Sequence, residues 1–220
     1  MKLWYARLLA AAALVGVVGA GVAVDKSANA QAVEQLRYKV THSIYGDIGT
    51  YTNTVQKSGN VTTIRTSVHF KVSMLGVVMH REDAERVERW QGDRLVYFDG
   101  TTDKNGKAIE VKGEAKGNAF VIQTPSGIIS APPTIHPANP WSAASLTSNT
   151  MMRVDSGKVE QVKITPGPET TVKVGSAMIP AREYTIDGST KYKVWIDSHD
   201  RPVKFTVADN SGEVTFTLER

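Results

Sequence analysis

The chain has 220 residues, with 26 lysines and arginines, 22 aspartates and glutamates, and no cysteine. The lack of cysteine excludes disulfides, thiolate metal sites, a cysteine nucleophile and lipidation of an N-terminal cysteine. The net charge of +4 is not gathered in a block of lysine and arginine, so nucleic-acid binding is not expected.

The first 30 residues have the three zones of a secretory signal peptide. Two basic residues precede an apolar run over residues 8–24, and Ala28-Asn29-Ala30 is an A-x-A cleavage motif. The alternative is an uncleaved membrane anchor, but a helix over that run spans only about 25 Å of a hydrocarbon core of about 30 Å. The sequence therefore predicts cleavage after Ala30 and a periplasmic or secreted protein. Residues 31–220 are then one β-rich domain with no stable membrane insertion.

After the signal, apolar residues recur at every second position, which is typical of half-buried strands. The first strand begins near Arg37 and places His42 on its apolar side. A hydrogen-bonded core histidine explains this position better than a metal ligand does. Gly46 and Gly49 predict a bend or bulge before a threonine-rich strand over residues 50–56.

The clearest strand covers residues 62–74, where apolar and polar residues alternate without a break. At about 3.3 Å per residue it extends about 40 Å, a length typical of a large curved sheet. Its apolar positions, with a tryptophan from the next hairpin, form the predicted ligand-lining face: Ile64, Val68, Phe70, Val72, Met74 and Trp90. Leu75–Met79 then interrupts the alternation at a glycine, which predicts a bend with apolar exposure.

Residues His80–Arg89 are mostly charged and fit two structures. Glutamates four residues before arginines suit a helix, whereas alternating opposite charges suit cross-strand pairs. We favour a strand because the run leads directly into the hairpin at Trp90. In either structure the run is expected to be a solvated surface.

The segment Glu88–Gly113 has the strongest hairpin pattern, with predicted turns at Gly92, Gly100 and Asn105-Gly106. Part of it, Asp99–Lys107, resembles a calcium-binding loop. It lacks the acidic residues that such a loop needs at its first and twelfth positions. We therefore expect no metal and no cofactor.

The sheet signals end at a break over Thr124–Gly127. The proline-rich segment that follows, Ala131–Met152, predicts a long crossover with one or two helical turns at Trp141–Leu146. His136 lies near Ser142 and Ser145 in sequence, as in some hydrolases. However, there is no G-x-S-x-G motif and no nearby acidic residue. We expect that the protein is not an enzyme, and that His136 lies on a surface loop.

The C-terminal half contains further strands joined by short turns, one of them predicted at Pro166-Gly167-Pro168, and this pattern predicts an antiparallel meander. His199 lies between two aspartates at one of these turns and is explained as a turn residue. The predicted fold is therefore mainly β. It is a large curved antiparallel sheet, a half-barrel or open barrel, with one proline-rich crossover and little helix.

Several segments resemble a family of bacterial exported proteins of unknown function: Trp90–Lys107, Ala138–Trp141, Val174–Gly188 and Val194–Lys204. That family in turn resembles the lipoprotein-carrier half-barrels of the Lol system, in which a curved sheet presents an apolar concave face to an acyl chain. The resemblance implies a fold and no catalytic residues. The carriers cover the concave face with helices, and here only Ala131–Met152 is available to cover it.

Two functions remain. The first is non-enzymatic binding of a hydrophobic small molecule or lipid in the cell envelope, on the predicted apolar face. The alternative is an envelope scaffold or protein-interaction module with a closed core and no ligand. The sequence does not indicate an oligomeric state.

Overall fold

The computed structural model describes residues 32–209 and 211–219, so the predicted signal peptide lies outside the described residues. Most of this part is strand, and its one helix is the short 3-10 helix η1 (Ala143–Leu146). No helix among the described residues has the length and apolar character needed to cross a membrane. The prediction of a mainly β fold with little helix is confirmed.

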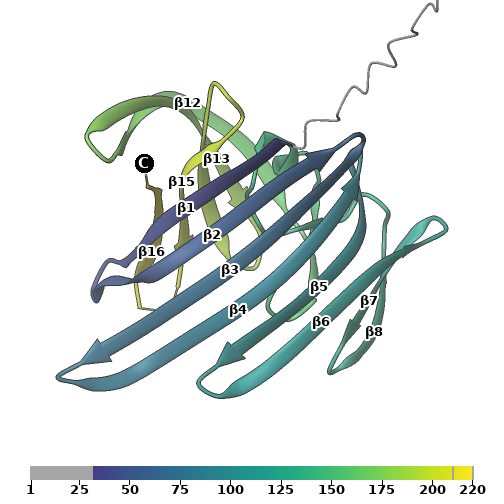
Figure 1. Cartoon of the computed structure of the whole chain (residues 1–220), viewed down its shortest axis with the longest axis horizontal. Helices are drawn as coiled ribbons and strands as arrows, with labels where there is room; N and C mark the ends of the chain where they lie inside the picture. Colours follow the sequence, from purple (N-terminus) through teal and green to yellow (C-terminus); the bar gives the residue numbers. More distant parts are fainter. Residues whose placement is uncertain (1–31, 210, 220) are drawn as a thin grey trace, which may run out of the picture.

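Thirteen strands form one antiparallel sheet. Their order across it is β12 (Lys163–Val174), β13 (Ala177–Asp187), β14 (Lys191–Asp197), β15 (Pro202–Ala208), β16 (Glu213–Leu218), β1 (Ala32–His42), β2 (Gly46–Ser58), β3 (Val61–Met74), β4 (Val77–Gln91), β5 (Arg94–Lys104), β6 (Lys107–Lys116), β7 (Ala119–Thr124) and β8 (Gly127–Ala131). The two outermost strands, β12 and β8, do not pair, so the curved sheet stays open (Figure 1). The C-terminal meander, β12 to β16, is confirmed.

A smaller sheet lies within the segment that joins β8 to β12. Its order is β11 (Val159–Gln161), β10 (Thr150–Met152) and β9 (His136–Pro137). β9 runs parallel to β10, and Pro137 can take part because it lies on the edge strand, where its missing N–H is not needed. The predicted crossover is therefore an ordered structure with its own small sheet, and the predicted helical turn is η1.

The alternation predicted for residues 62–74 is confirmed in β3, where Ile64, Val68 and Val72 are buried. His80–Arg89 is also confirmed as strand, inside β4. The prediction that this run is only solvated surface is wrong, because Arg86 and Glu88 are buried. Side chains two residues apart in a strand point to the same face, so Arg86 and Glu88 lie on the inner side of β4 together with the buried Trp90.

Two predicted turns are instead positions within strands. Gly100 lies in the middle of β5, opposite Arg86, and an added Cβ would meet the Phe98 ring at 3.0 Å and Arg86 Cγ at 3.2 Å. Glycine here leaves room for large side chains on the inner face. The Pro166-Gly167-Pro168 segment is a bulge in β12, where the pairing with β13 shifts register. The sheet also continues past its predicted end at residue 124, through the short strand β8.

The turn between β3 and β4 is apolar and exposed. Leu75 and Gly76 have φ values of 50° and 81°, close to the 55° and 85° of the confirmed Asn105-Gly106 turn. Leu75 is 98 % exposed. The other exposed apolar residues of this apolar turn are Met74, Val77, Val78 and Met79. The predicted bend with apolar exposure is confirmed.

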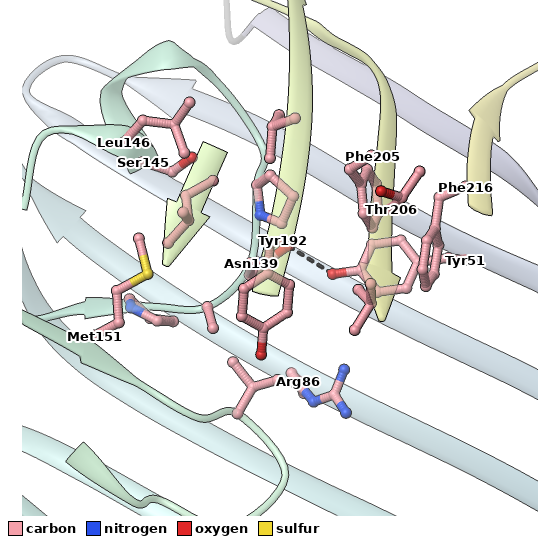
Figure 2. Close-up of a pocket in the computed structure, with 17 residues that line it drawn as sticks. Tyr51, Arg86, Asn139, Ser145, Leu146, Met151, Tyr192, Phe205, Thr206 and Phe216 are labelled. Atoms are coloured by element: carbon pink, nitrogen blue, oxygen red, sulfur yellow. Dashed lines mark hydrogen bonds between the residues drawn. The ribbon is translucent and has the colours of Figure 1, made fainter. Parts of the chain in front are cut away.

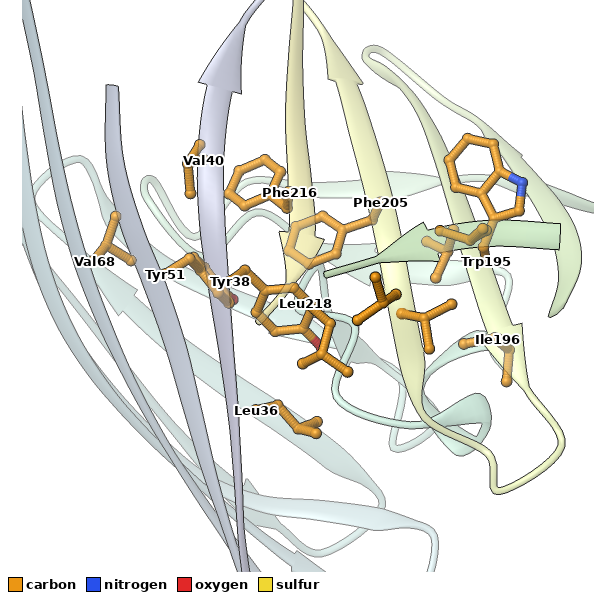
Figure 3. Packing of buried hydrophobic residues seen from close by; sticks show 14 of the residues in the cluster. Leu36, Tyr38, Val40, Tyr51, Val68, Trp195, Ile196, Phe205, Phe216 and Leu218 are labelled. Atoms are coloured by element: carbon orange, nitrogen blue, oxygen red, sulfur yellow. The ribbon is translucent and has the colours of Figure 1, made fainter. Parts of the chain in front are cut away.

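The hydrophobic core has two clusters. The first joins the C-terminal meander to β1, β2 and β3, and its centre is a stack of Phe205 on Phe216 with ring centroids 4.1 Å apart, next to Tyr38 (Figure 3). The second joins β2 to β7 with the crossover, where Trp141 packs beside Trp90 at 5.8 Å. The crossover therefore covers part of the sheet's inner face. His42, at the end of β1, is buried, with its Nε2 3.2 Å from Asp209 Oδ2, as predicted for a hydrogen-bonded core histidine.

Candidate functional site

Buried polar side chains cross the inner face of strands β2 to β5. Asn53, Thr66 and Arg86 lie opposite one another on adjacent strands β2, β3 and β4. Together with four neighbours they form what we call the polar seam: Tyr51, Asn53, Thr66, Arg86, Glu88, Thr102 and Asn139. Because buried polar groups are costly unless they are hydrogen-bonded, the partners of each one decide what the seam does.

Asn139, from the crossover, is the centre of the seam. Its Oδ1 accepts a hydrogen bond from the Tyr51 hydroxyl at 2.6 Å (Figure 2). The same oxygen accepts from Asn53 Nδ2 at 3.1 Å. Its Nδ2 donates to Glu88 Oε1 at 2.6 Å and to Thr66 Oγ1 at 3.2 Å. The amide thus uses both its donors and both its acceptor positions. These four bonds attach the crossover to β2, β3 and β4.

Glu88 is fully buried, and its carboxyl is held by neutral donors. Trp90 Nε1 donates to Oε2 at 3.0 Å, and Asn139 Nδ2 donates to Oε1. Burial raises the pKa of Glu88 to about 7, although these hydrogen bonds and the nearby Arg86 act to lower it. Near neutral pH, a large fraction of this carboxyl is therefore uncharged.

Arg86 is 5 % exposed and has few partners among the described residues. Its Nη2 donates to Thr102 Oγ1 at 3.2 Å, and its Nε is buried with no acceptor. No ion pair joins its guanidinium to a carboxylate in the described part of the chain, although salt bridges are frequent on the surface there. Arginine stays protonated inside proteins, so a full positive charge is buried here.

A pocket of about 120 Å³ lies next to the polar seam, between the C-terminal meander and the crossover (Figure 2). Most of its wall is apolar: Leu146, Met151, Val154, Ile186, Val194, Phe205, Val207 and Phe216. Polar groups from the seam also reach it, namely Tyr51, Arg86 and Asn139. Apolar walls with a few convergent polar groups are typical of small-molecule sites.

The predicted ligand-lining residues lie elsewhere. Ile64 and Trp90 are in the second core cluster, Val68 and Val72 are in the first, and Phe70 packs against the first. Met74 is at the apolar turn, 49 % exposed. None of the six lines the 120 Å³ pocket, and Trp90 contributes instead to a hollow beside the β4–β5 turn. Apart from Met74, the prediction chose inward positions on the sheet, but these side chains pack into or against the two core clusters and not against the pocket.

The surface position predicted for His136 is wrong. The residue is buried in β9, its Nδ1 donates to the Ser145 carbonyl at 3.3 Å, and its ring meets Trp90 edge-on at 4.8 Å. Burial lowers the pKa of its imidazole. The Ser145 hydroxyl donates to the Ser142 carbonyl, so it is not aligned toward the imidazole. His199, in contrast, is exposed at a turn as predicted, where its N–H donates to Asp197.

No cluster of three or more potential ligand side chains among the described residues is suited to a metal ion. The calcium-like segment forms part of β5 and its hairpin turn, where Asp103 Oδ1 accepts from the N–H of Gly106. That side chain is therefore a turn former.

The important residues that sequence reasoning missed were Arg86, Asn139 and Tyr51. Arg86 was predictable, because it lies an even number of residues from Trp90 on the same strand. Its side chain therefore points to the same inner face as that of Trp90. Asn139 belongs to the Ala138–Trp141 motif, but nothing local in sequence shows that its amide reaches three strands. Those contacts span 51 to 88 residues of chain.

The family described as a domain of unknown function (DUF6134) matches residues 38–219. The chain belongs to the DUF6134 family. The sequence resemblance to a family of unknown function is thereby confirmed. No curated protein sequence matches this DUF6134 chain.

A solved structure supports the architecture of this DUF6134 protein. It is the crystal structure of a beta-barrel-like protein of domain of unknown function DUF1849 from Brucella abortus, with a TM-score of 0.62 and 10 % sequence identity. The match covers 84 % of this chain and 95 % of that chain. At this identity the similarity shows a shared barrel-like fold and nothing about activity.

Proposed function

We propose that this DUF6134 protein is a non-enzymatic binding protein whose pocket beside the polar seam takes a small apolar ligand or the apolar end of a larger one. The observation that carries the proposal is an apolar pocket that meets buried hydrogen-bonding groups. Each CH₂ group transferred from water into such a pocket contributes about 0.8 kcal/mol. With the signal peptide that the sequence predicts, the site of action is the periplasm or the outside of the cell.

The pocket volume limits the ligand. About 120 Å³ is close to the roughly 150 Å³ of an apolar cavity that holds benzene, and it is below the roughly 300–1,000 Å³ of common ligand sites. A complete long acyl chain does not fit this space. We therefore favour a ligand of about six carbons, or entry by only the tail of a lipid.

The apolar turn favours a second candidate function, a protein-interaction module. Leu75 is almost fully exposed there, and apolar residues gathered on a surface often mark an interface. This function needs no ligand in the pocket, so a binding measurement distinguishes the two.

The test is a titration with 1-hexanol, observed through the NMR signals of the Leu146 methyl groups, which line the pocket. Val207→Phe fills the pocket wall, whereas Val33→Phe makes the same change at an exposed position on the outer face of β1. We expect saturable shifts in the wild type and in Val33→Phe, and affinity at least about tenfold weaker in Val207→Phe. If the wild-type signals do not shift, the pocket is not a binding site and the interaction module is the better explanation.

A further inference from the structure

The charge of Arg86 lacks a counterion in the described part of the protein. Its side chain is almost completely buried, its Nε has no acceptor, and its one hydrogen bond goes to a neutral threonine hydroxyl. An unpaired buried charge destabilises the folded state, because it loses its hydration and the protein interior does not replace it. Because its guanidinium borders a pocket, Arg86 can bind an anionic group of a ligand in that pocket.

Glu88, two residues further along β4, is the acidic candidate for a counterion, and its geometry does not suit that role. Both carboxylate oxygens are engaged by neutral donors, Asn139 Nδ2 and Trp90 Nε1. Its pKa of about 7 also leaves much of it uncharged at neutral pH. Arg86 therefore has no carboxylate hydrogen-bonded to its guanidinium among the described residues.

The local fold makes room for this arginine. Gly100 lies directly opposite Arg86 on β5, and any larger residue there would press on both the Arg86 stem and the Phe98 ring. On the other neighbouring strand, β3, the opposite residue is the small Thr66. The inner face is thus shaped to accommodate a large cationic side chain at the boundary between the seam and the pocket.

We propose that the ligand carries a carboxylate, that the Arg86 guanidinium binds this group, and that the hydrocarbon part lies against Phe205 and Phe216. This inference rests on the proposed function and narrows its ligand to short amphipathic carboxylic acids. A guanidinium offers parallel N–H donors that match the two oxygens of a carboxylate. The ligand supplies the missing negative charge, and the pocket wall supplies the apolar contact.

The test compares hexanoate with 1-hexanol, which share a six-carbon chain and differ in charge. A hydrogen-bonded ion pair is worth about 1.5–3 kcal/mol, so wild-type protein should bind hexanoate about 10- to 100-fold more tightly by calorimetry. Arg86→Met, which keeps an unbranched apolar stem, should remove this preference, so that hexanoate no longer binds more tightly than hexanol. Arg65→Met, at an exposed position on β3, should behave as wild type.

A second measurement keeps the proposal testable if Arg86→Met folds poorly. In wild-type protein the ¹⁵N and ¹H signals of Arg86 Nε should shift with hexanoate and not with hexanol, and Arg86→Lys assigns that signal by its absence. Equal affinity for the two compounds, with no Nε shift, would overturn the carboxylate assignment and leave the apolar pocket standing. Binding of neither compound would overturn the proposed function and this inference together.

Discussion

At the scale of single residues, Glu88 is a carboxyl group whose surroundings differ strongly from water. It is fully buried, and burial moves its pKa from 4.5 to about 7. The unfolded chain ionises near the lower value, and the folded protein ionises near the higher one. The folded state is therefore penalised as pH rises through this window, and the penalty is complete above pH 7 and absent well below pH 4.5.

Glu88→Gln should remove this pH dependence. At about 1.36 kcal/mol per pKa unit, the wild type should lose up to roughly 3 kcal/mol relative to the variant as pH rises from below 4.5 to above 7. The glutamine also loses a hydrogen bond, because its NH₂ faces a donor, but that loss is the same at every pH. Urea unfolding of both proteins across this range measures the difference. A constant difference would mean that Glu88 is not buried as a titrating acid.

At the scale of elements, the β3–β4 hairpin combines an unfavourable turn residue with exposed apolar surface. A turn with positive φ at both central residues favours Asn-Gly, and the β5–β6 turn has that sequence at residues 105–106. The β3–β4 turn has leucine at the equivalent position, with φ of 50°. Left-handed backbone costs an ordinary residue about 1–2 kcal/mol. Leu75 is therefore not the residue that stability alone would favour there.

Leu75→Asn should raise the free energy of unfolding by about 1 kcal/mol, because asparagine tolerates this conformation better and the leucine side chain has no buried contacts to lose. The matched control is Asn105→Leu, which should lower stability by at least as much, since Asn105 Oδ1 also accepts from the Arg81 N–H at 2.8 Å. Thermal melts of both variants test this. A destabilised Leu75→Asn would show that Leu75 has stabilising contacts of its own, for example with a second copy.

At the scale of the whole molecule, the crossover determines which part of the sheet's inner face is covered and where a pocket forms. It packs Trp141 into the second core cluster, and Asn139 attaches it to the strands across the seam. The pocket exists only where this cover meets the C-terminal meander. The position of the crossover therefore sets the shape of the site.

Asn139→Ala should detach part of this cover. Four hydrogen bonds are lost and several buried groups are left unpaired, so we expect the free energy of unfolding to fall by about 3–5 kcal/mol. Hydrogen exchange should quicken first at crossover amides such as Ile135. The control is Thr147→Ala, at an exposed position in the same segment, which should lower the free energy of unfolding by less than about 1 kcal/mol. Similar losses in both variants would contradict a central role for Asn139.

Sequence by itself determined most of the long strands, the inward and outward faces of β3, and the Asn105-Gly106 turn. These features depend on residues close together in the chain, since a period of two or a pair of positive-φ residues can be read within a few positions. For the same reason, the meander and the proline-rich crossover were predictable. The turn predicted at Gly100 was wrong, because the local sequence does not distinguish a glycine within a strand from a glycine in a turn. The distinction comes from the pairing of Gly100 with Arg86 on the neighbouring strand.

Only the tertiary structure decided that β1 lies between β16 and β2, that His136 is buried, and that the pocket lies away from β3. Each of these depends on contacts between segments far apart in the chain. Such contacts depend on how distant segments pack and pair with one another, and no local pattern encodes them. For Arg86 the alternation along β4 is enough to predict that its side chain points inward. Only the tertiary packing decides that its charge lies unpaired beside an apolar pocket.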